Sequence, residues 1–403
     1  MSSDRADHWL LERRATLLRV GVICLACCAM TAVLGSLITS DPGSSNFVPS
    51  VPQLFRSYLV AYLFCLCLAL GALVAHMLHA LTGGMWGVVL RPFLESAIQT
   101  IPLLALLFVP LCFGLGELYP WARWHADEIA GSVHLEQKAR YLNVPFFSVR
   151  AVFYLAVRSL LAWRLLRPYN THDAEHLRGR RNFSAFGLIA FTLTCTFASV
   201  DWVMSLEPLW YSSIFGMIFA ALQVLGGFAL ALVFLTALAE REPVREFATP
   251  DRLHDLGKLL LAFVMLWAYV AFSQFLLIWA GNLPEEITYY LKRFDGGWVY
   301  LALALVFFKF VAPFVMLLSR QTKRTSPALG KVALLLVVMT YFDLYWMVVP
   351  AFFPYQGLRL HWMSLLMWAG LASVLASIYM RNLARRLEEF EVDEPSAELM
   401  PDD

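Results

Sequence analysis

Charged residues are scarce in this chain. Of its 403 residues only 15% are Asp, Glu, Lys or Arg, whereas 60% are hydrophobic. Soluble globular domains carry about 25% charged residues, so the composition excludes an ordinary soluble protein and indicates a polytopic membrane protein. Acidic and basic residues nearly balance at a net charge of +1, which gives no electrostatic reason to expect nucleic acid as a partner.

The chain also has few residues that could ligate a redox cofactor. A two-haem site of the cytochrome b kind needs paired intramembrane histidines, but only His76, His79 and His361 lie in or near apolar runs, all near their ends. The cysteines lie within apolar runs and lack ferredoxin spacing, and Cys24 and Cys27 are expected to be packing residues. We therefore expect no haem, cluster or other metal-ligated cofactor in this chain.

Two other signals are missing. No loop has the pattern of a phosphate-binding turn, and we expect residues 83–87, Gly-Gly-Met-Trp-Gly, to form a turn between helices. No clear small-x-small cleavage site follows the first apolar run, so that run is expected to be a retained helix and not a removed signal peptide.

Long apolar runs are what the chain has in abundance. A run of about 20 residues spans the hydrocarbon core as a helix, and backbone groups in lipid must be hydrogen-bonded within their own segment. The runs therefore predict an all-α protein with ten transmembrane helices. The ten runs are 17–38, 57–80, 97–118, 147–166, 183–204, 211–238, 256–280, 296–319, 328–352 and 360–380.

Lysine and arginine are concentrated on one side. With the N-terminus placed in the cytoplasm, the inner segments and adjoining helix ends carry 21 of the 31 Lys and Arg residues, and the outer loops carry 7. The positive-inside rule then predicts two cytoplasmic termini. The predicted organisation is an N-terminal tail (1–16), a membrane domain (17–380) and an acidic C-terminal tail (381–403), disordered after Glu388. The outer loop 119–146 is expected to lie along the interface.

Three cations and three acids fall at bilayer depth, where an ionised side chain costs roughly 2.5–3.5 kcal/mol on insertion scales. Arg150 should lie at the height of Asp201 on an antiparallel neighbour, and Lys309 and Asp343 lie near the middle of adjacent helices. Each pair is either a packing contact or a functional site. The six residues are Arg150, Arg158, Lys309, Glu117, Asp201 and Asp343.

Titratable and amide side chains at intervals across the helices suggest a proton route, because buried carboxylates near opposite charges can exchange protons. From the inner to the outer side the candidates, besides Arg150 and Arg158, are His76, His79, Glu95, Gln99, Lys309, Gln223, Asp343, Gln274, Ser273, Asp201, Glu207 and Glu117.

The stretch 201–216 has an alternative role. Aromatic walls with one or two polar groups are typical of a quinone pocket, and this stretch combines Asp201 and Glu207 with Trp202, Trp210 and Tyr211. An aromatic belt at the membrane interface would have nearly the same composition.

Several blocks of the sequence carry a family resemblance, and together they cover most of the chain from Ser57 to Phe352. The blocks are 79–87 with Glu95 and Pro102, 118–121, 201–216, 255–258 with 267–274 and 282–286, 311–320 and, more weakly, 343–346. They resemble the ActF-type membrane subunits of alternative complex III, a quinol:electron-acceptor oxidoreductase, within the wider NrfD/polysulfide-reductase group of membrane subunits.

The resemblance implies ten helices, with two four-helix bundles (about 57–204 and 211–352) flanked by the first and last helices. It implies no haem or cluster in this subunit, and a complex with iron–sulfur and haem-c subunits in a bacterial inner membrane. It also implies a sister membrane subunit, which is thought to hold the main quinol site, and an acceptor such as a terminal oxidase. This subunit would then support quinone binding, proton translocation, or both. The family commonly has histidine where this chain has Lys309, which argues against a simple relay at that position.

Three hypotheses follow from the sequence. The first is a cofactor-free subunit of a quinol-oxidising respiratory complex, in which Asp201 and Asp343 adjust a quinone pocket or pass protons and His76 and Glu95 form an inner entry. The second is a secondary transporter, which would keep charges at mid-membrane but would have broken helices at matching places in two halves. The third is an assembly anchor in which every charge pair serves packing.

Overall fold

The computed structural model describes residues 5–38, 50–124, 133–167 and 174–393. Throughout these ranges the chain forms helices and no strand. Ten of the helical segments are long and apolar enough to cross a membrane, which confirms an all-α polytopic membrane protein.

Six of the ten spans are single helices and lie close to their expected positions: α1 (Ala6–Ile38), α2 (Val51–Thr82), α9 (Val144–Leu165), α11 (Phe215–Leu238), α13 (Pro250–Gly281) and α19 (Trp362–Asp393). Two more end in a short 3₁₀ turn: α10 (Ala174–Trp202) with η2 (Met204–Leu206), and α18 (Ser326–Val348) with η4 (Val349–Ala351). The third and eighth spans are interrupted: α3 (Met85–Ile98), α4 (Ile101–Leu106) and α5 (Val109–Phe113) form one, and α15 (Trp298–Leu305), η3 (Val306–Val311) and α16 (Ala312–Leu318) form the other.

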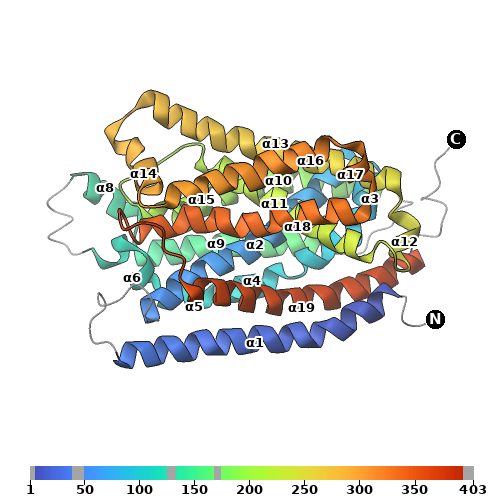
Figure 1. Ribbon diagram of the computed structural model, residues 1–403, viewed down its shortest axis with the longest axis horizontal. Coiled ribbons are helices and arrows are strands. Elements are labelled where there is room, and N and C mark those ends of the chain that lie inside the picture. Colours follow the sequence, from blue (N-terminus) through green and yellow to red (C-terminus); the bar gives the residue numbers. More distant parts are fainter. Residues whose placement is uncertain (1–4, 39–49, 125–132, 168–173, 394–403) are drawn as a thin grey trace.

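Short helices connect these spans. At one end of the molecule lie α6 (Leu115–Leu118), η1 (Pro120–Arg123), α8 (Val133–Tyr141) and α14 (Pro284–Phe294), and at the other end lie α12 (Val244–Phe247) and α17 (Arg320–Arg324). The start of α1 and the end of α19 share the second end (Figure 1), which we call the termini end. The opposite end is called the far end.

Side-chain caps begin several of the long helices. Ser50 accepts a hydrogen bond from the amide of Gln53 at the start of α2, and Asn143 accepts one from the amide of Phe146 at the start of α9. Both helices have proline in their first turn, where its missing N–H removes no helical hydrogen bond. These local signals explain why the two helices begin at the far end where they do.

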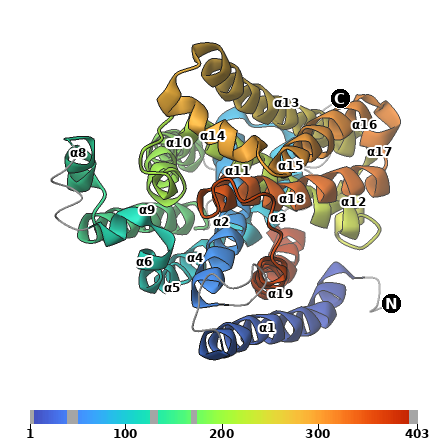
Figure 2. The same cartoon turned by 60° about the vertical axis from the view of Figure 1, so that its left-hand side comes forward.

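The helix α2 lies at the centre of the molecule (Figure 2), and 94% of the residues in its most apolar 18-residue stretch are buried. It packs against α3, α10, α11 and α19. The crossing with α11 is very close, because a Cβ atom on Gly71 would lie 1.7 Å from the backbone oxygen of Gln223 and one on Gly227 would lie 2.3 Å from the amide nitrogen of Ala72. Small residues at such crossings let transmembrane helices approach each other.

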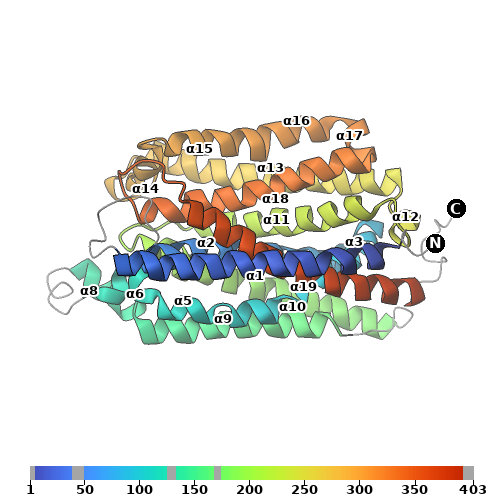
Figure 3. The same cartoon turned by 60° about the horizontal axis from the view of Figure 1, so that its bottom comes forward.

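The spans fall into two groups with an outer pair. The helices α2, α3, α9 and α10 pack on one side, and α11, α13, α16 and α18 pack on the other. The first helix, α1, runs along α19 at the edge of the molecule (Figure 1), and it lies in front of α19 in Figure 3. This arrangement agrees with two four-helix bundles and flanking first and last helices.

Several boundaries differ from those expected from the sequence. The third span begins at Met85 instead of residue 97, after two glycines with positive φ. Its one acid, Glu95, is neutralised by Arg91 one turn earlier at 3.2 Å, so the segment packs inside the bundle instead of forming a loop. The same span ends at Phe113, which places Glu117 beyond the apolar part of the helix.

The two chain ends are also more helical than predicted. The helix α1 begins at Ala6, within the expected N-terminal tail, and α19 continues to Asp393, past Glu388. In α19 an ion pair between Arg386 and Glu389 at 2.9 Å supports the last turns. The rest of the predicted disordered tail, 394–403, lies outside the described residues, as does His125 of the predicted interfacial loop.

Candidate functional site

A buried ion pair lies in the middle of the second bundle. Lys309 Nζ is 2.7 Å from Asp343 Oδ2, and the two side chains are 0% and 3% exposed. The indole N–H of Trp267 donates to the same carboxylate oxygen at 3.0 Å, and Lys309 Nζ lies 4.6 Å from the centre of the indole ring. The pairing predicted from the positions of Lys309 and Asp343 is confirmed.

Local backbone structure brings the lysine to this place. Lys309 lies in η3, a π-helical turn, followed by Pro313. Proline has no N–H, and its ring displaces the carbonyl of the residue four positions earlier, which here is Lys309. Such π-helical turns occur frequently at functional sites because they move one side chain out of the regular helical register.

A second ionic cluster lies toward the far end. Glu207 accepts from Arg293 Nη1 at 2.9 Å and from Lys292 Nζ at 2.6 Å. Arg293 also donates to the backbone oxygens of Trp346 and Met347, one turn beyond Asp343 on α18. The outer cluster therefore adjoins the central pair, and the side chain of Lys292, which is 23% exposed, connects it to the surface.

Charge and burial act in opposite directions on Glu207. Burial alone would raise its pKa, but Arg293 and Lys292 outweigh that effect and hold the pKa of the carboxyl below its usual range. Tyr290 in the same region has its pKa raised to about 12, chiefly by burial. Glu207 is therefore an ionised carboxylate at neutral pH.

The third cluster joins α9 to α10. Asp201 is 0% exposed and accepts two hydrogen bonds from Arg150, at 2.8 and 3.0 Å, and one from the Tyr154 hydroxyl at 2.9 Å. The guanidinium carbon of Arg150 lies 3.8 Å from the ring centre of Tyr141 and 4.2 Å from that of Phe146. The predicted pair of Arg150 and Asp201 is confirmed, and both partners are held by neighbours on several sides.

The fourth cluster lies near the termini end. Glu95 is bound by Arg91 at 3.2 Å and by Arg386 of α19 at 3.4 Å, and His76 Nε2 lies 3.9 Å from the same carboxylate. Arg180 donates to His76 Nε2. An arginine can only donate, so this nitrogen accepts and the ring proton of the neutral histidine lies on Nδ1.

The amide of Gln99 extends this cluster. With its oxygen turned toward Arg386, Gln99 accepts from Arg386 Nε at 2.8 Å and Nη2 at 2.9 Å. The structure thus brings together His76, Glu95 and Gln99, as the predicted inner entry requires.

Arg158 has no carboxylate within 4 Å among the described residues. It is 0% exposed, donates from Nη2 to the backbone oxygen of Thr194 at 3.2 Å and has its guanidinium carbon 5.1 Å from the ring centre of Trp202. Within the described chain, its Nε and Nη1 atoms donate to no other group. The expected balance of cations and acids at bilayer depth is therefore incomplete at this residue.

Glu117 does not supply the missing partner. It pairs with Arg123 beyond the end of the third span, and its side chain is 36% exposed. It was expected within the apolar run 97–118, but the third span ends at Phe113 and the chain continues as the separate short helix α6.

The predicted aromatic residues of the stretch 201–216 do not meet in one place. Trp202 packs on Phe108 within the first bundle, whereas Trp210 stacks on Tyr289 of α14 at 4.1 Å. Tyr211 is 57% exposed. Trp202 and Trp210 therefore make separate packing contacts and Tyr211 is exposed. These three aromatic side chains do not line one pocket beside Asp201.

The inner and central clusters are separated. The thiol of Cys67 lies near Lys309 and Asp343, and His76 follows nine residues later on α2, about 13.5 Å along the helix axis. Gln223 is buried between the bundles at 1% exposure. Farther toward the far end, Gln274 is 3% exposed and accepts a hydrogen bond from Ser212 at 3.4 Å. The neighbouring Ser273 donates to a backbone oxygen of its own helix. A proton crossing the inner stretch would need water molecules between these side chains.

Some residues of these clusters were not expected from the sequence. Arg293, 1% exposed, lies between the predicted runs 256–280 and 296–319, where the sequence predicts an outer loop and the structure has the helix α14. The amphipathic pattern of residues 284–294, with tyrosines on one face and charges beside them, is the signal that could have identified it.

Comparison with known proteins adds no identification. No family model matches the chain. A search of curated proteins finds no significant match.

Proposed function

We propose that this chain is a cofactor-free membrane subunit of a quinol-oxidising respiratory complex of the alternative-complex-III kind, and that its second bundle passes protons. In this proposal the complex lies in a bacterial inner membrane, the termini end faces the cytoplasm, and quinol is oxidised mainly in a sister membrane subunit. Iron–sulfur and haem-c subunits then carry the electrons to an acceptor such as a terminal oxidase. The sequence blocks described above support this assignment.

One observation carries the functional part of the proposal: the fully buried pair of Lys309 and Asp343 at a π-helical turn. A buried ion pair can often be replaced by apolar side chains at little or no cost in stability, so packing alone gives no reason for this pair. Its position gives one: it lies one helical turn from the Arg293–Glu207 cluster, which reaches the surface through Lys292. Asp343 is the group that would exchange protons, and Lys309 is its fixed counter-charge.

A quinone pocket at Asp201 has less support. The three hydrogen bonds that Asp201 accepts occupy its carboxylate, and the aromatic residues predicted to line the pocket lie apart. We therefore assign Asp201 a structural role and place the chemistry of this subunit at Asp343.

An assembly anchor is the second candidate function, and the complete set of partners around Asp201 favours it. A transporter is supported less. The helix interruptions fall in the third and eighth spans, whereas the seventh span, which would correspond to the third in a repeat of four helices, is one unbroken helix of 32 residues.

Purification from native membranes in a mild detergent tests the assembly. We expect haem-c absorbance and iron–sulfur and sister membrane subunits, identified by mass spectrometry, to accompany the full-length chain. A colourless chain that purifies alone and transports a solute in liposomes would contradict the proposal and favour the transporter.

A further inference from the structure

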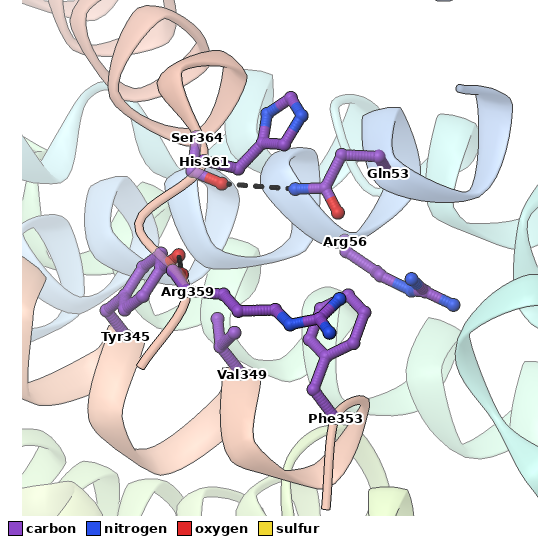
Figure 4. Close-up of a pocket in the computed structure, with 8 residues that line it drawn as sticks. All are labelled: Gln53, Arg56, Tyr345, Val349, Phe353, Arg359, His361 and Ser364. Atoms are coloured by element: carbon purple, nitrogen blue, oxygen red, sulfur yellow. Dashed lines mark hydrogen bonds between the residues drawn. The ribbon is translucent and has the colours of Figure 1, made fainter. Parts of the chain in front are cut away.

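A small hollow opens at the far end. It lies where α2 and α19 begin and α18 ends. It is partly open to the surface, and its enclosed part has room for only about one water molecule. Figure 4 shows the side chains around it. They are Gln53, Arg56, Tyr345, Val349, Phe353, Arg359, His361 and Ser364.

Two arginines at this hollow lack acidic partners. No carboxylate of the described residues lies within 4 Å of Arg56 or Arg359, and the buried Nε atom of each donates to no group in that part of the chain. The guanidinium carbons lie 4.9 and 4.8 Å from the ring centre of the same phenylalanine, Phe353. The two positive charges therefore lie within about 10 Å of each other, and Arg359 repels Arg56 electrostatically. A bound anion would offset this repulsion.

The nearest acid is already occupied. Glu117 is close enough to affect Arg56 electrostatically, but its carboxylate is paired with Arg123. The positive charge at the hollow is thus left uncompensated by the described side chains.

The floor of the hollow is polar and ordered. Gln53 donates to the hydroxyls of Ser57 and Ser364, at 3.2 and 3.4 Å, and these hydroxyls lie 2.9 Å apart. All three residues are buried and belong to the first two turns of α2 or the first turn of α19. The partial positive charge at the start of each long helix adds to that of the arginines.

We propose that Arg56 and Arg359 bind a phosphate group at the open mouth of this hollow. Arginine is suited to this ligand because its planar guanidinium can donate two parallel hydrogen bonds to phosphate oxygens. A lipid headgroup is the expected source, since Leu360, Trp362 and Leu365 beside the hollow are 46%, 40% and 40% exposed and offer an apolar surface to acyl chains. Free phosphate is the other source with the same chemistry.

The test uses the delipidated full-length chain in mild detergent, with phosphatidylglycerol or inorganic phosphate as the probe. Binding is measured by native mass spectrometry and by the rise in apparent melting temperature. The variant R56Q/R359Q should bind phosphatidylglycerol at least about tenfold more weakly, because it loses the charged donors. The matched control is R140Q, whose side chain is 82% exposed at the same end.

The outcomes are distinct. Binding of phosphatidylglycerol but not inorganic phosphate assigns the site to a lipid, and binding of both supports a phosphate site open to free anions. Equal affinity of R56Q/R359Q and the parent chain, or no binding of either probe, would overturn the proposal. If the double variant does not fold, R359Q alone gives the same comparison. The result is independent of whether the chain belongs to a respiratory complex.

Discussion

Replacing Asp201 by asparagine should destabilise the protein strongly. Asp201 and Arg150 lie 2.8 Å apart, and at an effective dielectric constant of about 20 their attraction is about 6 kcal/mol. Most of this offsets the loss of hydration of two ions, so the net contribution of the intact pair is small. Asp201→Asn removes one charge only and leaves the buried guanidinium of Arg150 uncompensated, which costs about 3–5 kcal/mol.

A double-mutant cycle measures this coupling. The free energy of unfolding is obtained in mixed detergent micelles for the parent chain, Asp201→Asn, Arg150→Gln and the double variant. The double variant keeps an acceptor for Tyr154 and no longer holds an unpaired charge, so it should recover about 2–3 kcal/mol relative to the sum of the single changes. Additive losses, or a stable Asp201→Asn variant with reduced turnover of the complex, would refute the structural role of Asp201.

Three further predictions concern other contacts. The pKa of Glu207 is lowered in the folded protein, so the stability that its ionised form contributes is present above the usual glutamate pKa and is lost as pH falls through the lowered value. Glu207→Gln should therefore make the melting temperature decline less steeply with pH below about pH 4.5. Gly71→Ala should lower the free energy of unfolding by about 1–3 kcal/mol or more, because the added Cβ would meet the α11 backbone. Gly281→Ala, whose Cβ would have no atom within 4 Å, is the control and should be tolerated. Equal melting temperatures of the two variants would contradict the close crossing of α2 and α11. Trp267→Phe removes the hydrogen bond to Asp343 and should cost about 1.5–3 kcal/mol in the same assay, and an unchanged value would count against that bond.

The sequence was sufficient for the fold class and for two ion pairs. Ten apolar runs of the right length leave helices as the only way to satisfy the backbone in lipid. Arg150 and Asp201 lie on consecutive antiparallel helices, so their heights could be compared directly, and the same holds for Lys309 and Asp343. Neighbouring transmembrane helices thus allow contacts to be inferred from residue numbers alone.

Contacts between distant segments could not be inferred in this way. The bond from Arg293 to Glu207 joins residues 86 positions apart, and its lysine neighbour reaches the same carboxylate. Both cations lie in a stretch whose composition is that of a loop. Its helical structure depends on tyrosines packed against Trp210 and Trp346, which hydropathy does not register.

Glu95 shows a second limit. A carboxylate interrupts an apolar run in a hydropathy profile, so the third helix was expected to begin after it. In the structure Arg91 and Arg386 neutralise Glu95, and the segment from Met85 is buried. The cost of burying a charge depends on partners from other helices, and α19 is almost 300 residues away in the sequence.

Proton translocation by the purified complex tests the central proposal most directly. Quinol-driven release of protons from proteoliposomes would be compared for the parent complex, Asp343→Asn, and Asp255→Asn, a matched control whose exposed carboxylate pairs with Lys258 at 2.9 Å. We predict that Asp343→Asn lowers the number of protons moved per quinol oxidised while the complex still assembles, and that Asp255→Asn leaves it unchanged. An assembled Asp343→Asn complex with the parent ratio of protons to quinol would contradict a proton-transfer role for the buried pair.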